Sequence, residues 1–152
     1  MWSIAIAVVA LVLDQASKWL VMTRLTLFEQ SPIIPGLFSL QFVYNPGAAF
    51  SIFRNQRLFL ILIALAAVGG MLYYLRDPEN RKGLSGWGMG LLIGGTLGNL
   101  TDRIRTGEVV DFLLFYWKDW SFPNFNVADI CITVGVGLLI LHMLLTGEKR
   151  PA

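Results

Sequence analysis

Residues 4–22 read IAIAVVALVLDQASKWLVM, an apolar run close to the roughly 20 residues that cross a bilayer as a helix. Asp14 and Lys18 interrupt this run one helical turn apart, so both lie on one helix face. That face must point toward other helices, either as an ion pair that fastens them or to meet a substrate, because lipid does not tolerate charge. No Lys or Arg precedes the run, and the apolar pattern continues beyond Asp14. We therefore expect a retained membrane span and not a cleaved secretory signal.

Three further apolar segments extend the pattern, at residues 58–75, 87–101 and 128–145. The segment at 87–101 is the weakest, because it is short and rich in glycine. The composition agrees with a membrane protein, since 55% of the 152 residues are hydrophobic and only 14% are charged, against roughly 25% charged in soluble domains. We predict an all-α membrane protein, a bundle of four transmembrane helices that forms one domain over residues 1–152.

The composition also narrows the classes of partner and cofactor. A net charge of +2 is too small to indicate nucleic-acid binding, and no basic run alternates with aromatic residues. Cys131 and His142 are the single cysteine and the single histidine of the chain, so a tetrahedral Cys/His zinc site cannot form. The carboxylates follow no recognisable metal-binding loop pattern. We expect neither a metal nor another cofactor.

An even number of spans places both termini on the same side of the membrane, and the positive-inside rule indicates which side. The short loop between the second and third spans carries Arg76, Arg81 and Lys82, and the C-terminal tail carries Lys149 and Arg150. The two longer loops carry a similar number of basic residues, so positive charge is densest in the short loop and the tail. This density favours cytoplasmic termini, with the first and third loops outside.

The first loop is rich in aromatic and aliphatic residues. Residues 37–44 read LFSLQFVY and predict a strand, which ends at the turn signal Asn45-Pro46-Gly47. We predict a second strand at residues 48–53. A sheet on a membrane protein must lie outside the hydrocarbon or be covered by protein. The sequence therefore predicts a small extracytoplasmic sheet, a cradle, in the first loop.

Two aspartates occupy apolar surroundings near the predicted span ends. Asp111 follows two valines and precedes Phe112, and Asp129 closes the sequence FNVAD at residues 125–129. Ionisable residues at a membrane boundary are costly and tend to be functional. Two carboxylates brought together share one proton, so one acts as an acid and the other as a base, as an aspartic protease requires. Asp129 has an equally good structural interpretation, because Asn126 and Asp129 have the spacing of a helix cap, and both interpretations are compatible.

The predicted third span contains recurring glycines and ends in a group of polar residues. Asn99, Asp102 and Arg103 share one helix face and form either a polar helix end or part of a site. Glycines recur every fourth residue on the same helix and favour close helix packing, and Gly95 beside them leaves room for a ligand. The recurring glycines are Gly86, Gly90, Gly94 and Gly98.

Five sequence blocks together identify a resemblance. They are DQASK at residues 14–18, NPGAAFS at 45–51, GGTLGNLTDR at 94–103, VVDF at 109–112 and FNVAD at 125–129. In this order on a four-span chain they resemble the bacterial lipoprotein signal peptidase family, also called signal peptidase II. The resemblance covers nearly the whole chain. It implies a multi-pass protein of the bacterial inner membrane with cytoplasmic termini and an outer active site.

The resemblance also implies the chemistry. Asp111 and Asp129 would form the catalytic pair of an aspartic endopeptidase, working as a monomer. Its substrate would be a prolipoprotein whose cysteine carries a diacylglyceryl group, cleaved just before that cysteine, and globomycin would inhibit it. The family's supporting positions correspond to Asp14, Lys18, Asn45, Gly47, Gly95, Asn99, Arg103, Val109, Phe125, Asn126 and Ala128.

Other classes of protein compete with this interpretation. A small carrier or channel subunit would use the intramembrane acidic residues as an ion path, but such proteins often show repeated halves, which this chain lacks. Other intramembrane aspartic proteases carry a Gly-x-Gly-Asp element, and no aspartate here follows that pattern. A purely structural subunit would leave the polar residues of the spans unexplained.

Overall fold

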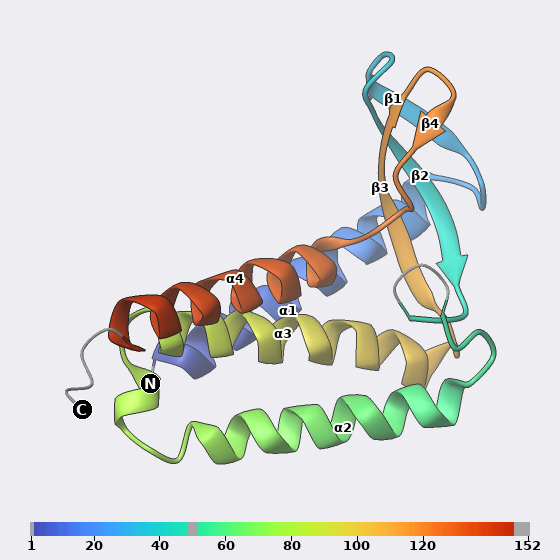
Figure 1. The fold of residues 1–152 in the computed structure, drawn as a ribbon. Helices are drawn as coiled ribbons and strands as arrows, with labels where there is room; N and C mark the ends of the chain where they lie inside the picture. The colour runs from blue at the N-terminus through green and yellow to red at the C-terminus, as the bar shows by residue number, and fades with distance from the viewer. Residues whose placement is uncertain (1, 49–51, 148–152) are drawn as a thin grey trace.

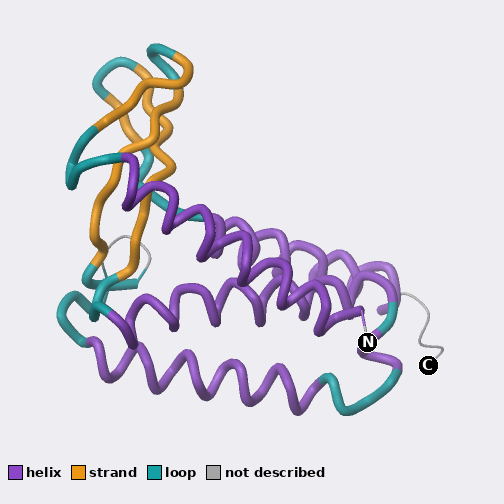
Figure 2. The backbone as a smooth tube through the Cα atoms, turned by 180° about the vertical axis from the view of Figure 1, so that it is seen from behind, coloured by secondary structure: helices purple, strands orange, loops and turns teal. Residues whose placement is uncertain are grey.

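The computed structural model of the chain describes residues 2–48 and 52–147, and four long helices dominate it (Figure 1). The helices are α1 (Trp2–Arg24), α2 (Arg57–Tyr74), α3 (Gly83–Arg105) and α4 (Val127–Gly147), with the short 3-10 helix η2 (Glu79–Arg81) between α2 and α3. They lie side by side, and a small sheet stands at one end of the bundle (Figure 2). The start of α1 and the end of α4 lie together at the opposite end.

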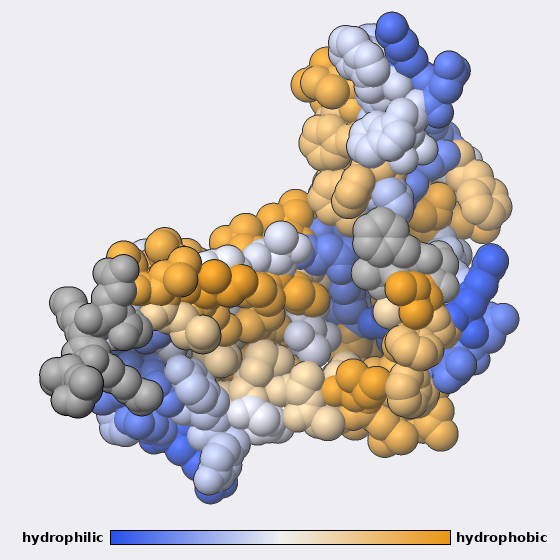
Figure 3. All heavy atoms as spheres, in the orientation of Figure 1, coloured by the Kyte–Doolittle hydropathy of each residue, from blue (hydrophilic) through white to orange (hydrophobic). Residues whose placement is uncertain are grey.

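Three of these helices are long and apolar enough to cross a membrane, namely α1, α2 and residues Val127–Thr146 of α4. Their bounds agree with the predicted spans to within two residues. Many large apolar side chains on them are exposed, among them Leu58 and Leu62 on α2 and Leu144 on α4. Figure 3 shows apolar residues over the outward sides of α4 and α2, with hydrophilic residues gathered toward the two ends. This distribution is what a lipid environment requires.

The remaining helix, α3, forms the centre of the bundle and packs against α1, α2 and α4. Eleven of its 23 residues are buried, against two of 18 in α2. It extends four residues beyond the predicted segment at each end, because its glycines are packing positions and do not break the helix. A Cβ atom at Gly94 would lie 2.5 Å from the carbonyl oxygen of Ala7 in α1, and one at Gly95 would lie 2.5 Å from that of Ala128 in α4.

The sheet has four antiparallel strands in the order β1-β2-β3-β4. They are β1 (Gln30–Ile34), β2 (Phe38–Asn45), β3 (Val109–Trp117) and β4 (Trp120–Ser121). Strand β2 confirms the strand predicted at residues 37–44. The second strand predicted at 48–53 is wrong where the structure describes it, since residues 52–55 form a turn, and residues 49–51 lie outside the described residues.

The sheet is therefore shared between two loops and is not a product of the first loop alone. Strand β1 was not predicted from the sequence. It contains Pro32, which is tolerated because β1 lies at the edge of the sheet. Strand β3 comes from the third loop and pairs with β2, so that Asn45 lies opposite Val109 and Val43 opposite Asp111. This pairing brings together residues that are 64 and 68 positions apart in sequence.

A small apolar cluster fastens the sheet to the end of α1. Val21 of α1 packs with Phe42 of β2 and with Val110 and Phe112 of β3. Asp111 lies between the last two residues, so the cluster fixes the backbone on both sides of it. The sheet projects sideways from the bundle (Figure 1), and a hydrophilic patch lies in the angle between sheet and helices (Figure 3).

Candidate active site

Asp111 and Asp129 reach the same place from different elements. Asp111 lies on β3 and is only 3% exposed, whereas Asp129 lies half-buried in the first turn of α4. Both accept hydrogen bonds from Asn126. Its side-chain Nδ2 donates to Oδ1 of Asp111 at 2.7 Å, and its backbone N–H donates to Oδ2 of Asp129 at 3.1 Å. One residue therefore bridges the two carboxyl groups that the sequence singles out.

Asn126 and Asp129 also form the helix cap that the sequence predicts. The backbone N–H of Asp129 donates to Oδ1 of Asn126 at 3.0 Å, while the backbone N–H of Asn126 donates to Asp129. This reciprocal pair satisfies two N–H groups at the start of α4. The structural interpretation of Asp129 is thus confirmed, and the cap holds its carboxyl group in a fixed orientation beside Asp111.

The environment of Asp111 changes its acidity. Burial is the largest cause of a shift that raises the pKa of Asp111 from 3.8 to about 7, and the nearby negative charge of Asp129 contributes to it. Hydrogen bonds from Asn126 and from Nδ2 of Asn45, at 3.0 Å, act in the opposite direction, as does the charge of Lys18. At neutral pH the protonated and the ionised forms of Asp111 are therefore both populated, as acid–base chemistry requires.

Asn99 of α3 connects the pair to the buried charge on α1. Its Oδ1 accepts hydrogen bonds from Nζ of Lys18 at 2.9 Å and from Nδ2 of Asn126 at 3.1 Å. Because both partners are donors, the Asn99 amide must turn its own Nδ2 the other way, where it donates to Oδ1 of Asp129 at 2.8 Å. Lys18 thus orients an oxygen of Asp129 through one intermediate side chain.

Lys18 itself is enclosed by two carboxylates. Its Nζ lies 2.8 Å from Oδ2 of Asp14 and 2.7 Å from Oδ2 of Asp102, and Lys18 is 1% exposed. With the bond to Asn99, all three ammonium donors have partners. Asp14 also accepts a hydrogen bond from the backbone N–H of Ala128 at 2.9 Å, so it supports the first turn of α4 from α1.

Asp102 and Gln15 belong to the same network, although neither was among the predicted supporting positions. Asp102 accepts hydrogen bonds from Nε2 of Gln15 at 2.9 Å and from the backbone N–H of Val110 at 3.2 Å. The second bond ties α3 to the residue that precedes Asp111. The signal in the sequence was the position of Asp102 one turn after Asn99, which also suits a solvated helix end.

Arg103 holds the turn that follows β2. Its Nη2 donates to the carbonyl oxygen of Gly47 at 2.7 Å and its Nη1 to that of Asn99 at 3.3 Å. Gly47 in turn donates its N–H to Oδ1 of Asn45 at 3.0 Å. Arg103 lies close enough to interact electrostatically with Asp111 and Asp129.

The other predicted positions support the backbone around the pair. Ala128 is fully buried and Val109 is 3% exposed, so both act through packing. Gly95 allows α3 to approach Ala128. The carbonyl oxygen of Phe125 accepts the backbone N–H groups of Phe112 at 3.0 Å and Leu113 at 2.8 Å, which fixes the chain just before α4 against β3.

Metal ligands do not gather in this site. Within residues 2–48 and 52–147, no group of three or more His, Cys, Asp or Glu side chains is placed to hold an ion. The site brings together two carboxyl groups that share Asn126 as a hydrogen-bond donor.

The amino-acid sequence is similar to those of known proteins over nearly its whole length. A family model described as signal peptidase (SPase) II matches residues 6–145. A lipoprotein signal peptidase of Symbiobacterium thermophilum is 59% identical over 152 residues, with 100% of both chains covered. One of Geobacter metallireducens is 44% identical over 150 residues, covering 97% of this chain and 92% of the relative.

Solved structures agree with the sequence comparisons. One, described as a bacterial membrane enzyme, superposes with a TM-score of 0.90 at 31% identity, covering 99% of this chain and 92% of the other. A second bacterial membrane enzyme gives a TM-score of 0.84 at 32% identity. The match extends over the helices and the sheet alike, and the chain belongs to the signal peptidase II family.

Proposed function

We propose that this protein removes the signal peptide from prolipoproteins as an aspartic endopeptidase, with Asp111 and Asp129 as the catalytic pair. The observation that carries the proposal is the shared partner Asn126, which holds one carboxyl group on β3 and one on α4 side by side. The relatives that match the chain over nearly its whole length are lipoprotein signal peptidases. Two acidic residues of the helices, Asp14 and Asp102, are both paired with Lys18, which argues against their use as an ion path by a carrier or channel.

The mechanism follows from the different environments of the two groups. Burial favours the protonated form of Asp111, so we assign it the resting proton, although the pair titrates as a unit. Ionised Asp129 accepts a proton from a water molecule, whose oxygen attacks the scissile carbonyl carbon while Asp111 donates its proton to the carbonyl oxygen. The tetrahedral intermediate then collapses, as its hydroxyl returns a proton to Asp111 and Asp129 protonates the leaving amine. Proton transfer of this kind contributes about 10²–10⁴-fold to the rate.

The supporting residues position the substrate and the pair. Asn45, Asn99 and Asn126 orient the carboxyl oxygens, and Arg103 fixes the turn at Gly47 beside them. Asp14 and Lys18 hold Asn99 and the first turn of α4 in place. Precise positioning of water and peptide supplies the part of the rate enhancement that proton transfer does not.

We further propose that the residue after the scissile bond is a diacylglyceryl-modified cysteine. The exposed apolar sides of the helices allow the two acyl chains to stay in the bilayer beside the bundle (Figure 3). Moving them into water would cost about 0.8 kcal/mol per methylene. A soluble protease would have to meet that cost, whereas a membrane-embedded one does not.

The proposed topology has four spans, including α3. At 1.5 Å per residue the 23 residues of α3 extend about 34 Å, enough for a hydrocarbon core of roughly 30 Å. Five of its glycines lie against α1 or α4, so its low hydropathy does not prevent insertion; they are Gly88, Gly90, Gly94, Gly95 and Gly98. We place both termini in the cytoplasm, the sheet and the pair on the outer side of the bacterial inner membrane, and the protein as a monomer.

The direct test is cleavage of a purified precursor by the full-length protein in detergent or lipid. We expect the diacylglyceryl-modified prolipoprotein to be cut just before the modified cysteine, which mass spectrometry of both products shows. The unmodified precursor should be cut far more slowly, and globomycin should block the reaction. Absence of cleavage, together with ion flux in proteoliposomes, would favour the carrier alternative.

A further inference from the structure

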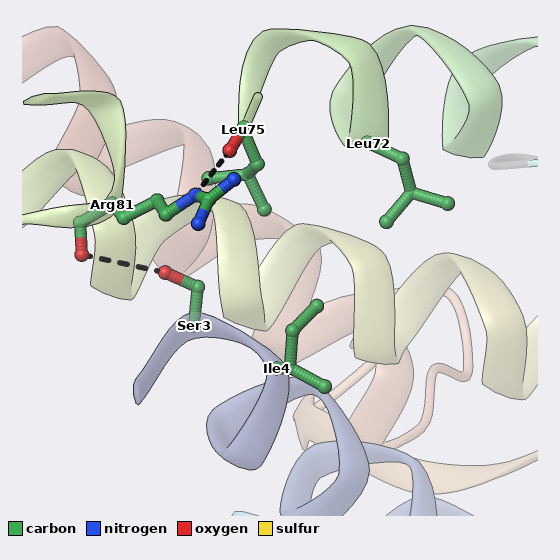
Figure 4. A pocket seen from close by; sticks show the side chains of 5 residues that line it. All are labelled: Ser3, Ile4, Leu72, Leu75 and Arg81. Carbon is green, nitrogen blue, oxygen red and sulfur yellow. Dashed lines mark hydrogen bonds between the residues drawn. The ribbon is translucent and has the colours of Figure 1, made fainter. Parts of the chain in front are cut away.

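A notch opens between α1 and α2 at the end of the bundle away from the sheet. Its walls come from three elements: Ser3 and Ile4 of α1, Leu72 of α2 with Leu75 just after it, and Arg81 of η2 (Figure 4). Its volume is about 310 Å³. Neither the catalytic pair nor its supporting residues contribute to it.

The two ends of the notch differ in chemistry. Ile4 and Leu72 point toward each other across the gap and are 51% and 45% exposed, so aliphatic surface lines the part that opens sideways (Figure 4). Arg81 closes the other part with its guanidinium group. The notch is apolar along one part and ends at a cation, so it is complementary to a molecule with a hydrocarbon chain and an anionic head group.

The guanidinium group of Arg81 is held in position before any ligand binds. Its Nε donates to the carbonyl oxygen of Leu75, and its Nη2 donates to that of Arg76 at 3.2 Å. A guanidinium group has five N–H donors, so these two bonds leave three for another acceptor. Pre-positioned guanidinium groups bind phosphate oxygens well, because two parallel hydrogen bonds form without further ordering.

The charges around the notch favour an anion. Residues 76–82 hold three basic and two acidic side chains, a net charge of +1. Both acidic side chains already have partners in the loop, since Asp77 accepts the backbone N–H of Glu79 at 2.9 Å and Glu79 pairs with Lys82 at 2.6 Å. Arg76 lies over the ring of Tyr73 at 5.4 Å, on the side where α2 ends.

We propose that the notch binds an anionic phospholipid, with its phosphate on Arg81 and an acyl chain between Ile4 and Leu72. Basic pockets between transmembrane helices recognise anionic head groups in this way. A lipid here would join the end of α2 to α1, two helices that are otherwise linked through α3. The inference uses the proposed topology only to assign the inner leaflet, and it does not depend on peptidase activity.

Native mass spectrometry of the full-length protein tests the proposal with two probes of identical acyl chains, phosphatidylglycerol and phosphatidylcholine. We expect the wild type to bind the anionic lipid roughly tenfold more tightly, the size of one charge-assisted interaction. Arg81→Gln should abolish this preference. Lys82→Gln, which removes a positive charge from the same loop outside the notch, should retain it.

A second pair of variants leaves the Arg81 contacts to the end of α2 intact. Leu72→Trp fills the apolar part of the notch and should weaken the binding of both lipids several-fold, whereas Leu62→Trp on the same helix, at a 56% exposed position outside the notch, should not. Equal lipid binding by Leu72→Trp and Leu62→Trp, or a wild type without preference for the anionic lipid, would overturn the proposal. Because the readout is lipid binding, this result is independent of whether the protein cleaves prolipoproteins.

Discussion

Asn99 and Asn126 connect the charged side chains of the site, so that no carboxyl group in it depends on a single contact. Each amide uses its oxygen and its nitrogen in different directions, which fixes both its own orientation and that of its partners. Lys18 stands at the origin of this network, because it donates to Asn99 while it neutralises Asp14 and Asp102.

Replacing Lys18 therefore affects both stability and activity. Lys18→Met would leave the carboxylates of Asp14 and Asp102 buried without their cation, which typically costs about 3–5 kcal/mol in the free energy of unfolding. It would also remove a donor that orients Asn99. We expect a large drop in the thermal unfolding midpoint in detergent and loss of cleavage. Lys82→Gln is the control, because its ion pair with Glu79 is exposed to solvent, and an unchanged midpoint in Lys18→Met would contradict the role given to the network.

The raised pKa of Asp111 predicts how rate and stability depend on pH. Between the ordinary pKa of a carboxyl group, 3.8, and about 7, the folded protein keeps a proton on Asp111 that the unfolded chain has released. The free energy of unfolding must therefore fall as pH rises through this window and level off above it. In the proposed mechanism the same proton serves as the general acid, so kcat/KM should also fall as pH rises through about 7.

The variant Asp111→Asn separates the pH dependence that arises from Asp111 from that of the other titratable groups. The variant has no proton to lose at this position, so the decrease in its unfolding midpoint between pH 5 and 8, measured in the same detergent, should be smaller than that of the wild type. An equal decrease in both proteins would show that Asp111 does not hold its proton at neutral pH.

At the scale of elements, the helices were largely predictable and the sheet was not. Apolar runs of bilayer length identify α1, α2 and α4 within two residues, because each run maps directly onto one helix. Strand β2 shows the expected pattern in its own sequence. Strand β1 contains Pro32, and the pairing of β3 with β2 joins residues far apart in the chain, which no local pattern reveals. The sequence predicted Asp111 and Asp129 as one site. It left Asp102 open between a polar helix end and part of a site, and it gave no role to Gln15, whose hydrogen bond to Asp102 joins two helices far apart in the chain.

The close contact between α3 and α4 predicts a strong effect at one glycine. In Gly95→Ala the new Cβ atom would lie 2.5 Å from the carbonyl oxygen of Ala128, so α4 must shift at the turn that carries Asp129. A displacement of about 1 Å at a catalytic group can reduce the rate about 10²-fold. We expect a marked loss of cleavage, read from initial rates.

Gly137→Ala provides a matched control on α4. A Cβ atom at Gly137 would have no neighbouring atom within 4 Å among the described residues, so its rate and unfolding midpoint should stay close to those of the wild type. Similar rates for the two alanine variants would show that the α3–α4 contact does not position Asp129.

The two ends of the molecule differ in composition, and the proposed topology assigns them to opposite sides of the membrane. The sheet and the polar network lie at one end, and the start of α1, the end of α4 and the loop with η2 lie at the other (Figure 1). If α1, α2 and α4 crossed the membrane but α3 did not, the first and third loops would face opposite compartments, and β2 and β3 could not pair in one sheet. The position of α3 in the membrane is therefore the feature on which the orientation depends.

Labelling with a membrane-impermeant maleimide distinguishes these cases. In a Cys131→Ala background, Asp119→Cys places a thiol in the turn between β3 and β4, and Glu79→Cys places one in η2. We expect intact spheroplasts to label the first variant only, with the second labelled after lysis. Labelling of both thiols in intact spheroplasts would contradict the four-span topology.

The central claim is that Asp111 and Asp129 together carry out the cleavage. The most direct measurement compares the wild type with Asp111→Asn and Asp129→Asn, near-isosteric changes that remove one ionisable group each, on a diacylglyceryl-modified prolipoprotein. Unfolding midpoints establish that all three proteins are folded, and product formation is followed by gel shift and mass spectrometry. We predict cleavage by the wild type and by neither variant. Near-full activity in either variant would show that its aspartate is only a cap or a scaffold, and would contradict the catalytic pair.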